Sequence, residues 1–95
     1  MNGKAVLVTG GNRGIGKAIA LGFAGEGANV TICGRDEAAL TEAKMEIEAK
    51  GVRAVAVVAD LFDAEGCKSA IAAASETFGR LDILVNNAST NIGGR

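Results

Sequence analysis

The segment Val8–Ala18, VTGGNRGIGKA, joins an apolar run to a run with helical spacing, and it decides how the chain is interpreted. Glycines let a backbone approach an anion closely and adopt positive φ angles. The N–H groups at a helix start, here around Gly14–Gly16, supply donors and the positive end of a helix dipole. The segment therefore predicts a phosphate-binding loop between a strand and a helix.

Two kinds of phosphate loop compete for this segment. Read from Gly11 it is Gly-x4-Gly-Lys-Ala, close to a nucleotide-triphosphatase P-loop. That loop needs Lys17 on the terminal phosphates and a Ser or Thr at the next position to hold magnesium, but Ala18 cannot bind a metal. Asp60 ends an apolar run, which suits either a magnesium ligand or a buried strand. Read from Thr9 the segment is Thr-Gly-x3-Gly-x-Gly, a dinucleotide loop, which we favour over the P-loop and over a glycine turn without a ligand.

Apolar runs alternate with helical patterns along the whole chain. The apolar runs predict strands at Lys4–Thr9, Asn29–Cys33, Arg53–Ala59 and Asp82–Val85. The helical patterns predict helices at Ile15–Gly25, at Glu37–Lys50, and from a cap at Asp63 to about Phe78. Such alternation implies parallel strands joined by right-handed crossovers, with helices on both faces. We predict an α/β, Rossmann-like doubly wound sheet of four strands in order 3-2-1-4 with three helices.

Helix ends and buried faces are also predicted. Asp36 suits an N-cap, and Gly27, Gly51 and Gly79 suit the residues that end helices. Lys17 is expected to be solvated. The first predicted helix has apolar and small residues at helical spacing, and the second has a buried stripe. The third has an apolar face. These residues are, in turn, Ile15, Ile19 and Phe23 with Ala18 and Gly22, then Leu40, Ala43 and Ile47, then Ile71, Ala74 and Phe78.

Composition excludes several classes of function. The 95 residues carry a net charge of −1, so a basic footprint for nucleic acid is missing. No apolar run reaches the roughly 20 residues that span a bilayer, and the N-terminus lacks the layout of a signal peptide. The chain has no His and only two cysteines, which argues against a metal site. We expect a cytoplasmic protein without a nucleic-acid or membrane partner.

The predicted strand Asp82–Val85 would form an edge of the sheet. A long apolar edge is an aggregation hazard. We therefore expect an incomplete domain, in which residues 1–95 are the amino-terminal part of a larger protein. On its own, the chain is expected to be marginally stable or to associate with itself through this strand.

Three motifs resemble the short-chain dehydrogenase/reductase family. TGGNRGIG at Thr9–Gly16 is similar to its cofactor loop, and Asp60 followed by Leu61 is similar to its motif after the third strand. NNAS at Asn86–Ser89 is similar to its Asn-Asn-Ala-Gly motif, with Ser89 in place of Gly. The resemblance covers essentially the whole chain but only the amino-terminal part of a family member. It is strongest to the branch that includes the 3-oxoacyl-carrier-protein reductases.

The resemblance implies roles for residues at the strand ends. Asp60 would accept a hydrogen bond from the adenine amino group, and the Leu61 backbone would support the base. Thr9 and Asn87 would hold loops together. The other implied cofactor contacts are Gly10, Asn12, Arg13, Gly14 and Ile15 on the pyrophosphate and adenosine ribose, and Asn86 and Ala88 on the nicotinamide ribose.

The end of the second predicted strand favours NADP over NAD. An NAD enzyme usually places an acid there, on the ribose 2′-hydroxyl. This chain has Gly34 and then Arg35, whose planar guanidinium suits a 2′-phosphate, and Arg13 can approach from the other side. Asp36 is close, but helix capping explains it better.

The chain lacks the residues that would carry out catalysis. It contains no Tyr and no His. The resemblance implies a catalytic Ser, a Tyr-x3-Lys pair and an Asn, all beyond the fourth strand, so no catalytic residue is assigned here. We expect an inactive chain, and a parent enzyme that is a homo-oligomer using NADP on a small-molecule carbonyl or alcohol. The alternative is a binding-only dinucleotide sensor on the same fold.

Overall fold

The computed structural model describes residues 2–10, 14–60 and 64–87. Its strands are β1 (Ala5–Thr9), β2 (Asn29–Gly34), β3 (Ala54–Val58) and β4 (Ile83–Val85). Its helices are α1 (Gly14–Gly25), α2 (Glu37–Glu48) and α3 (Ala64–Phe78). All strand pairs are parallel, in the order β3-β2-β1-β4. The predicted strand order and the three helices are therefore confirmed.

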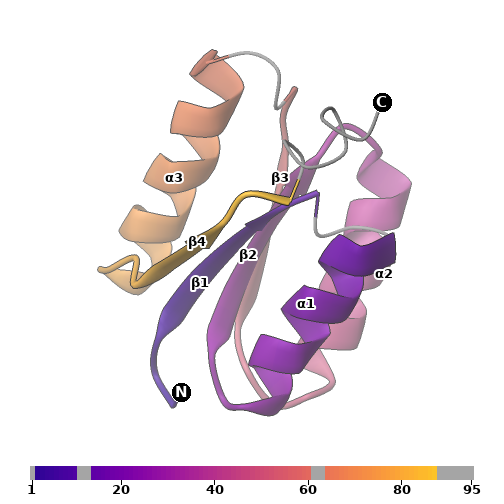
Figure 1. Cartoon of the computed structure of the whole chain (residues 1–95), viewed down its shortest axis with the longest axis vertical. Coiled ribbons are helices and arrows are strands. Elements are labelled where there is room, and N and C mark those ends of the chain that lie inside the picture. The colour runs from indigo at the N-terminus through magenta and orange to yellow at the C-terminus, as the bar shows by residue number, and fades with distance from the viewer. Residues whose placement is uncertain (1, 11–13, 61–63, 88–95) are drawn as a thin grey trace.

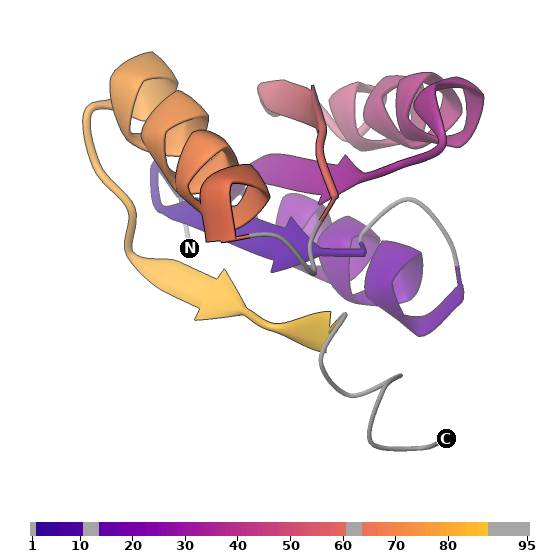
Figure 2. The same ribbon diagram turned by 90° about the horizontal axis from the view of Figure 1, so that it is seen from above.

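The sheet is covered by helices on both faces. Helix α3 lies on one face, while α1 and α2 lie side by side on the other (Figures 1 and 2). This three-layer arrangement follows from the crossovers, since each helix must return the chain to the start of the next parallel strand. As a result, the carboxyl ends of all four strands meet at one edge of the sheet.

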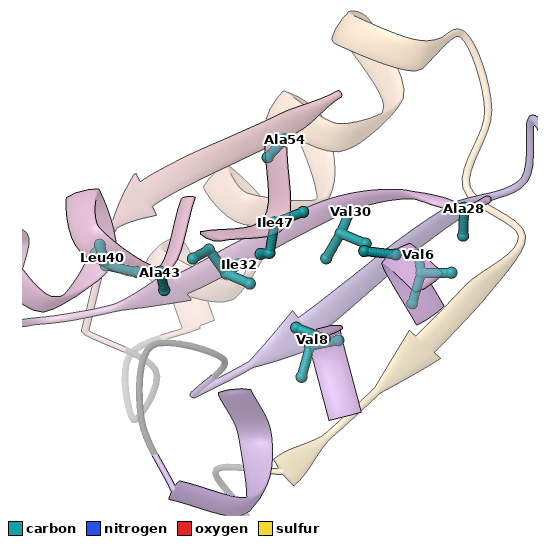
Figure 3. Packing of buried hydrophobic residues seen from close by; sticks show 11 residues of the cluster. Val6, Val8, Ala28, Val30, Ile32, Leu40, Ala43, Ile47 and Ala54 are labelled. Atoms are coloured by element: carbon teal, nitrogen blue, oxygen red, sulfur yellow. The ribbon is translucent and has the colours of Figure 1, made fainter. Parts of the chain in front are cut away.

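The larger core fills the space between the sheet and the helices α1 and α2. Figure 3 shows side chains of β1 and β2, such as Val8 and Ile32, gathered with those of α2. The predicted stripe of α2 is confirmed, since Leu40, Ala43 and Ile47 are at most 1% exposed.

In α1 the buried positions are small rather than large. Gly16, Ala20 and Ala24 are buried. Ile15, Ala18 and Gly22, which have helical spacing in the sequence, are exposed, and Ile15 is 74% exposed. Small side chains let α1 approach the strands closely, and the larger Ile19 and Phe23 pack at the border of the core.

The opposite face of the sheet has a smaller core. Leu7 of β1 and Cys33 of β2 pack there with Ala70 of α3. Ala74 is fully buried as predicted, but Ile71, expected beside it, is 39% exposed. Alanines of α3 face the sheet, as alanines of α1 do. Because these small side chains let each helix lie close to the sheet, they take the buried positions, and Ile15 and Ile71 are exposed.

Helix ends follow the predicted chemistry. Asp36 accepts a hydrogen bond from the Ala39 N–H at 3.1 Å, which confirms it as the N-cap of α2. Gly27, Gly51 and Gly79 have φ angles of +92°, +92° and +74°, where side chains are disfavoured. Helix α2 ends two residues earlier than predicted, because the Lys50 N–H donates to the Ile47 carbonyl oxygen in a tighter final turn. The predicted cap Asp63 lies outside the described residues.

Strand β4 is joined to β1 by a carboxylate as well as by the sheet. The Ala5 N–H donates to Asp82 Oδ2 at 2.8 Å, and the Asp82 N–H donates to the Ala5 carbonyl oxygen at 2.9 Å. Arg80 donates to the same carboxylate through Nε at 2.8 Å and Nη2 at 2.9 Å. These contacts hold the start of β4 against the start of β1.

One buried hydroxyl provides a test of the packing between β2 and α3. Thr31 is fully buried, and its Oγ1 has no hydrogen-bond partner within the described part of the chain. A buried hydroxyl without a partner destabilises a protein by roughly 1–3 kcal/mol. We predict that Thr31→Val raises the free energy of unfolding by about 1 kcal/mol, measured by urea denaturation. Thr9→Val, which removes a hydroxyl with partners, is the control and should not stabilise the protein; equal effects would contradict the interpretation.

The carboxylate of Asp82 should make the stability of the protein depend on pH. Hydrogen bonds from Arg80 and from the Ala5 N–H lower the pKa of Asp82 below its ordinary value of 3.8. The contribution of this carboxylate to stability is therefore present above about pH 4 and is lost as the pH falls through the lower, folded-state pKa. We predict that Asp82→Asn has a lower urea midpoint than wild type at pH 6. Below pH 3 the difference between the two midpoints should become smaller.

Glu48→Gln provides the matched control for Asp82→Asn. Glu48 is exposed at the end of α2 and has no ion pair among the residues that the structure describes. Its substitution should leave the pH profile of the midpoint unchanged. A constant gap between Asp82→Asn and wild type from pH 6 to pH 2 would show that the carboxylate charge is irrelevant.

Candidate nucleotide-binding site

The carboxyl ends of the four strands bring the predicted site residues to one edge. Thr9 is paired with Cys33, and Cys33 with Val57, so the three strands end level. The chain beyond each strand stays attached: the Gly10 N–H donates to the Cys33 carbonyl oxygen at 2.9 Å, and the Ala59 N–H donates to the Gly34 carbonyl oxygen at 2.8 Å. Gly10, Arg35, Asp60 and Asn86 therefore leave the sheet at the same edge.

Backbone contact shapes the glycine-rich loop. Gly10 and Gly14 have φ angles of +69° and +57°. A Cβ at Gly16 would overlap the Gly10 carbonyl oxygen and would lie 2.8 Å from Asn87 Nδ2. The absence of a side chain at position 16 therefore lets α1 begin directly against the end of β1. The helix start, with Ile15 exposed beside it, faces the same edge as the strand ends; Asn12 and Arg13 lie outside the described residues.

Thr9 connects the loop to the end of β4. Its side chain is nearly buried, and Oγ1 lies 3.3 Å from both the Val85 carbonyl oxygen and Asn86 Oδ1. The hydroxyl can donate to either oxygen. This confirms that Thr9 holds loops together, and the position of Asn87 beside Gly16 agrees with the same role for Asn87. Asn86 keeps an exposed position at the site, while Ala88 lies outside the described residues.

Lys17 is directed away from the phosphate loop. Its ammonium forms an ion pair with Glu46 of α2 and lies 3.9 Å from Glu42 Oε1. The hydrogen bond to Glu46 raises the pKa of Lys17 above its ordinary value. Lys17 is in the first turn of α1, as expected, but its side chain is 25% exposed and ion-paired, so it is only partly solvated. A lysine held by α2 does not do what a P-loop lysine must do, which further weakens the triphosphatase interpretation.

Two neighbouring charged residues follow β2, and only one is used in folding. Asp36 caps α2. Arg35 is exposed, and it has neither an ion pair nor a side-chain hydrogen bond in the described parts of the chain. The cation at this corner is therefore available to an anionic ligand, whereas the acid is committed to the helix.

Asp60 occupies the edge beyond β3. It is exposed, two residues past Val58, and Leu61 lies outside the described residues. Gly66, in the first turn of α3, packs against the Asp60 backbone. Gly66 is not among the residues predicted from the sequence, although a glycine within a predicted helix is itself a signal of close packing.

Two hollows on the surface differ in position. One of about 60 Å³ is lined by Leu7, Thr9, Ala70, Ile71, Leu84 and Asn86, and it adjoins the site. It is too small to enclose a dinucleotide, which would have to lie across the edge of the sheet. Another, of about 430 Å³, lies at the amino ends of the strands beside Lys50 and Arg53, away from the glycine-rich loop.

The described residues contain neither a metal-binding cluster nor a helix suited to a membrane. There, no group of three His, Cys, Asp or Glu side chains is arranged to hold a metal ion. Nor does any helix in these residues have the length and apolar character needed to cross a membrane.

A parallel doubly wound sheet with a glycine-rich first turn and polar residues at the strand ends defines a nucleotide-binding α/β protein. The family model for short chain dehydrogenases matches residues 4–95. The chain therefore belongs to the short-chain dehydrogenase family, as the three motifs predicted.

Two curated relatives of the chain are oxidoreductases by name. It is 44% identical over 89 residues to L-rhamnose 1-dehydrogenase (NAD(P)(+)) of a Sphingomonas species, covering 93% of this chain and 35% of the relative. It is 45% identical over 91 residues to a rhamnolipid-biosynthesis 3-oxoacyl-[acyl-carrier-protein] reductase of Pseudomonas aeruginosa, covering 96% and 35%. The chain thus spans about a third of the length of these relatives.

A solved structure agrees with the fold. L-sorbose reductase of Gluconobacter frateurii, complexed with NADPH and L-sorbose, is 41% identical and matches with a TM-score of 0.87. The match covers 92% of this chain and 34% of the reductase. The described sheet is thus a Rossmann fold of the short-chain dehydrogenase type.

Proposed function

We propose that this chain is the NADP(H)-binding part of a cytoplasmic oxidoreductase that reduces a small-molecule carbonyl or oxidises an alcohol. The observation that carries the proposal is the close contact of Gly16 with the Gly10 carbonyl, which aims the start of α1 at the sheet edge. The unpaired N–H groups of a helix start favour a pyrophosphate. Membership of the family supports the reaction class.

The residues at the edge suit the parts of a dinucleotide. Arg35 would hold a 2′-phosphate, and Asp60 would accept from the adenine amino group. The remaining proposed contacts are Gly10, Asn12, Arg13, Gly14 and Ile15 for the pyrophosphate and adenosine ribose, Leu61 for the base, and Asn86 and Ala88 for the nicotinamide ribose. Thr9 would keep the Asn86 end aligned with the loop through its hydrogen bonds.

The preference for NADP(H) is supported by the different roles of Arg35 and Asp36, which follow β2. The carboxylate of Asp36 is occupied by the Ala39 N–H, so it is poorly placed to receive a ribose hydroxyl. The guanidinium of Arg35 is exposed beside it. A planar fork of donors matches phosphate, and charge-assisted hydrogen bonds are stronger than neutral ones.

This chain would bind and orient the cofactor, but it would not complete the reaction. The bound nicotinamide supplies or accepts the hydride. The substrate oxygen also needs a positioned proton donor, and the chain contains neither Tyr nor His. We expect the 95-residue chain alone to show no turnover of any ketone or alcohol. We also propose that the parent enzyme acts as a homo-oligomer.

The cofactor preference provides the test. We predict that the complete parent protein binds NADPH at least about tenfold more tightly than NADH, corresponding to about 1.4 kcal/mol, as measured by calorimetric titration. Arg35→Asp should remove most of this preference because it replaces the cation with an acid. The control is Lys50→Asp, which changes the charge equally at the opposite end of the strands and should leave the preference intact.

The outcomes separate the parts of the proposal. Equal or reversed affinities in wild type would refute the assignment of NADP. Loss of preference in Lys50→Asp as well would mean that net charge, rather than Arg35, discriminates the cofactors. Binding of neither cofactor would refute the proposed site as a whole.

A further inference from the structure

Gly66 is a glycine within a helix, where alanine is more favourable. It is the third residue of α3, and it is half-buried. A Cβ at this position would overlap the Asp60 carbonyl oxygen and would lie 3.0 Å from the Asp60 carbonyl carbon and 3.2 Å from its nitrogen. These are backbone atoms, so a side chain at Gly66 could fit only if the segment at Asp60 or the helix moved.

The loop after β1 has the same construction. Gly16 is the third residue of α1, and its absent Cβ makes room for the carbonyl oxygen of Gly10, six residues earlier. Gly66 stands in the same relation to Asp60, also six residues earlier. In both turns, a glycine in the first helical turn lets the helix rest on the backbone that leaves the strand.

Other helical glycines lack this contact. Gly22 and Gly25 of α1 would each place a Cβ in open space, with no atom within 4 Å. The close approach at Gly66 is therefore a property of its position and not of glycines in helices generally. What Gly66 fixes is the backbone of the residue that the proposed site assigns to the adenine base.

We propose that Gly66 is a positioning residue for base selectivity, which holds Asp60 where its carboxylate meets the amino group of adenine. The inference rests on the proposed function, in which Asp60 faces the base. Hydrogen bonds weaken steeply with distance and angle, so moving the Asp60 backbone by a few tenths of an ångström to a full ångström impairs that contact. Gly66 itself touches no ligand in this arrangement.

The experiment compares NADPH with its hypoxanthine analogue, deamino-NADPH. The analogue carries an acceptor oxygen where adenine carries its amino donor, and the two ligands are otherwise nearly identical. Wild type should bind NADPH about tenfold more tightly than the analogue, the discrimination expected of one hydrogen bond to a charged group. In Gly66→Ala the ratio should fall below about threefold, chiefly through weaker binding of NADPH.

Matched variants separate positioning from general destabilisation. Gly22→Ala places the same methyl group in open space on α1, and it should keep the tenfold ratio. Asp60→Ala should lose the ratio as Gly66→Ala does, and the double variant should lose no more than either single one. Additive losses, or an unchanged ratio in Gly66→Ala, would overturn the proposal.

Failure of the proposed function gives different results. A wild-type chain that does not bind NADPH refutes the nucleotide site itself. A wild-type chain that binds both ligands equally refutes the role of Asp60 and therefore that of Gly66, while the site remains. A preference that is retained in Gly66→Ala overturns only the inference about Gly66.

A measurement on wild type covers the case in which Gly66→Ala does not fold. In amide NMR spectra, NADPH should shift the resonances of Asp60 and Gly66 together, whereas deamino-NADPH should shift both less. The Gly25 amide provides the reference. Gly25 is on α1, far from Asp60 in the sequence, and a Cβ at this position would have no atom within 4 Å. If NADPH shifted the Asp60 resonance and left the Gly66 resonance unchanged, the proposal would be overturned.

Discussion

The contact between Gly16 and the Gly10 carbonyl is the constraint on which the rest of the site depends. It brings the first turn of α1 against the end of β1, and the helix start then faces the sheet edge. The same contact places Asn87, which follows β4, next to Gly16. One missing methyl group thus fixes the relation among the first strand, the first helix and the fourth strand. A side chain there would have to displace backbone, because the nearest neighbour is the Gly10 carbonyl.

Much of the fold could be predicted because its signals are local. Alternating apolar and helical patterns set the order of elements, and Asp36 and the glycines at helix ends were visible as single residues. The burial of helix faces was harder, because it depends on how closely a helix approaches the sheet. Ile15 and Ile71 fit the apolar pattern, yet alanines on adjacent faces allow tighter packing and take the buried positions.

The site was predictable to the extent that parallel strands must end at one edge. Gly10, Arg35, Asp60 and Asn86 reach that edge for this reason. The partner of Lys17 could not be found in the same way. Glu46 lies on another helix, and only the packing of α1 beside α2 brings the two charges together. The role of Gly66 was not predicted because it depends on the absence of a side chain beside the Asp60 backbone.

The pairing of the strands affects how easily each part of the site opens locally. Among the described residues, β2 is bonded on both sides, whereas β4 pairs with β1 alone, through three residues from Ile83 to Val85. Regions with few such bonds open locally at lower free energy than the interior of a sheet. Opening of β4 would release the Thr9 contact with Asn86 but leave Arg35 and Asp60 on the intact strands. Asn86 therefore follows a strand that is held by three residue pairs, whereas Asp60 follows a strand that is held by five.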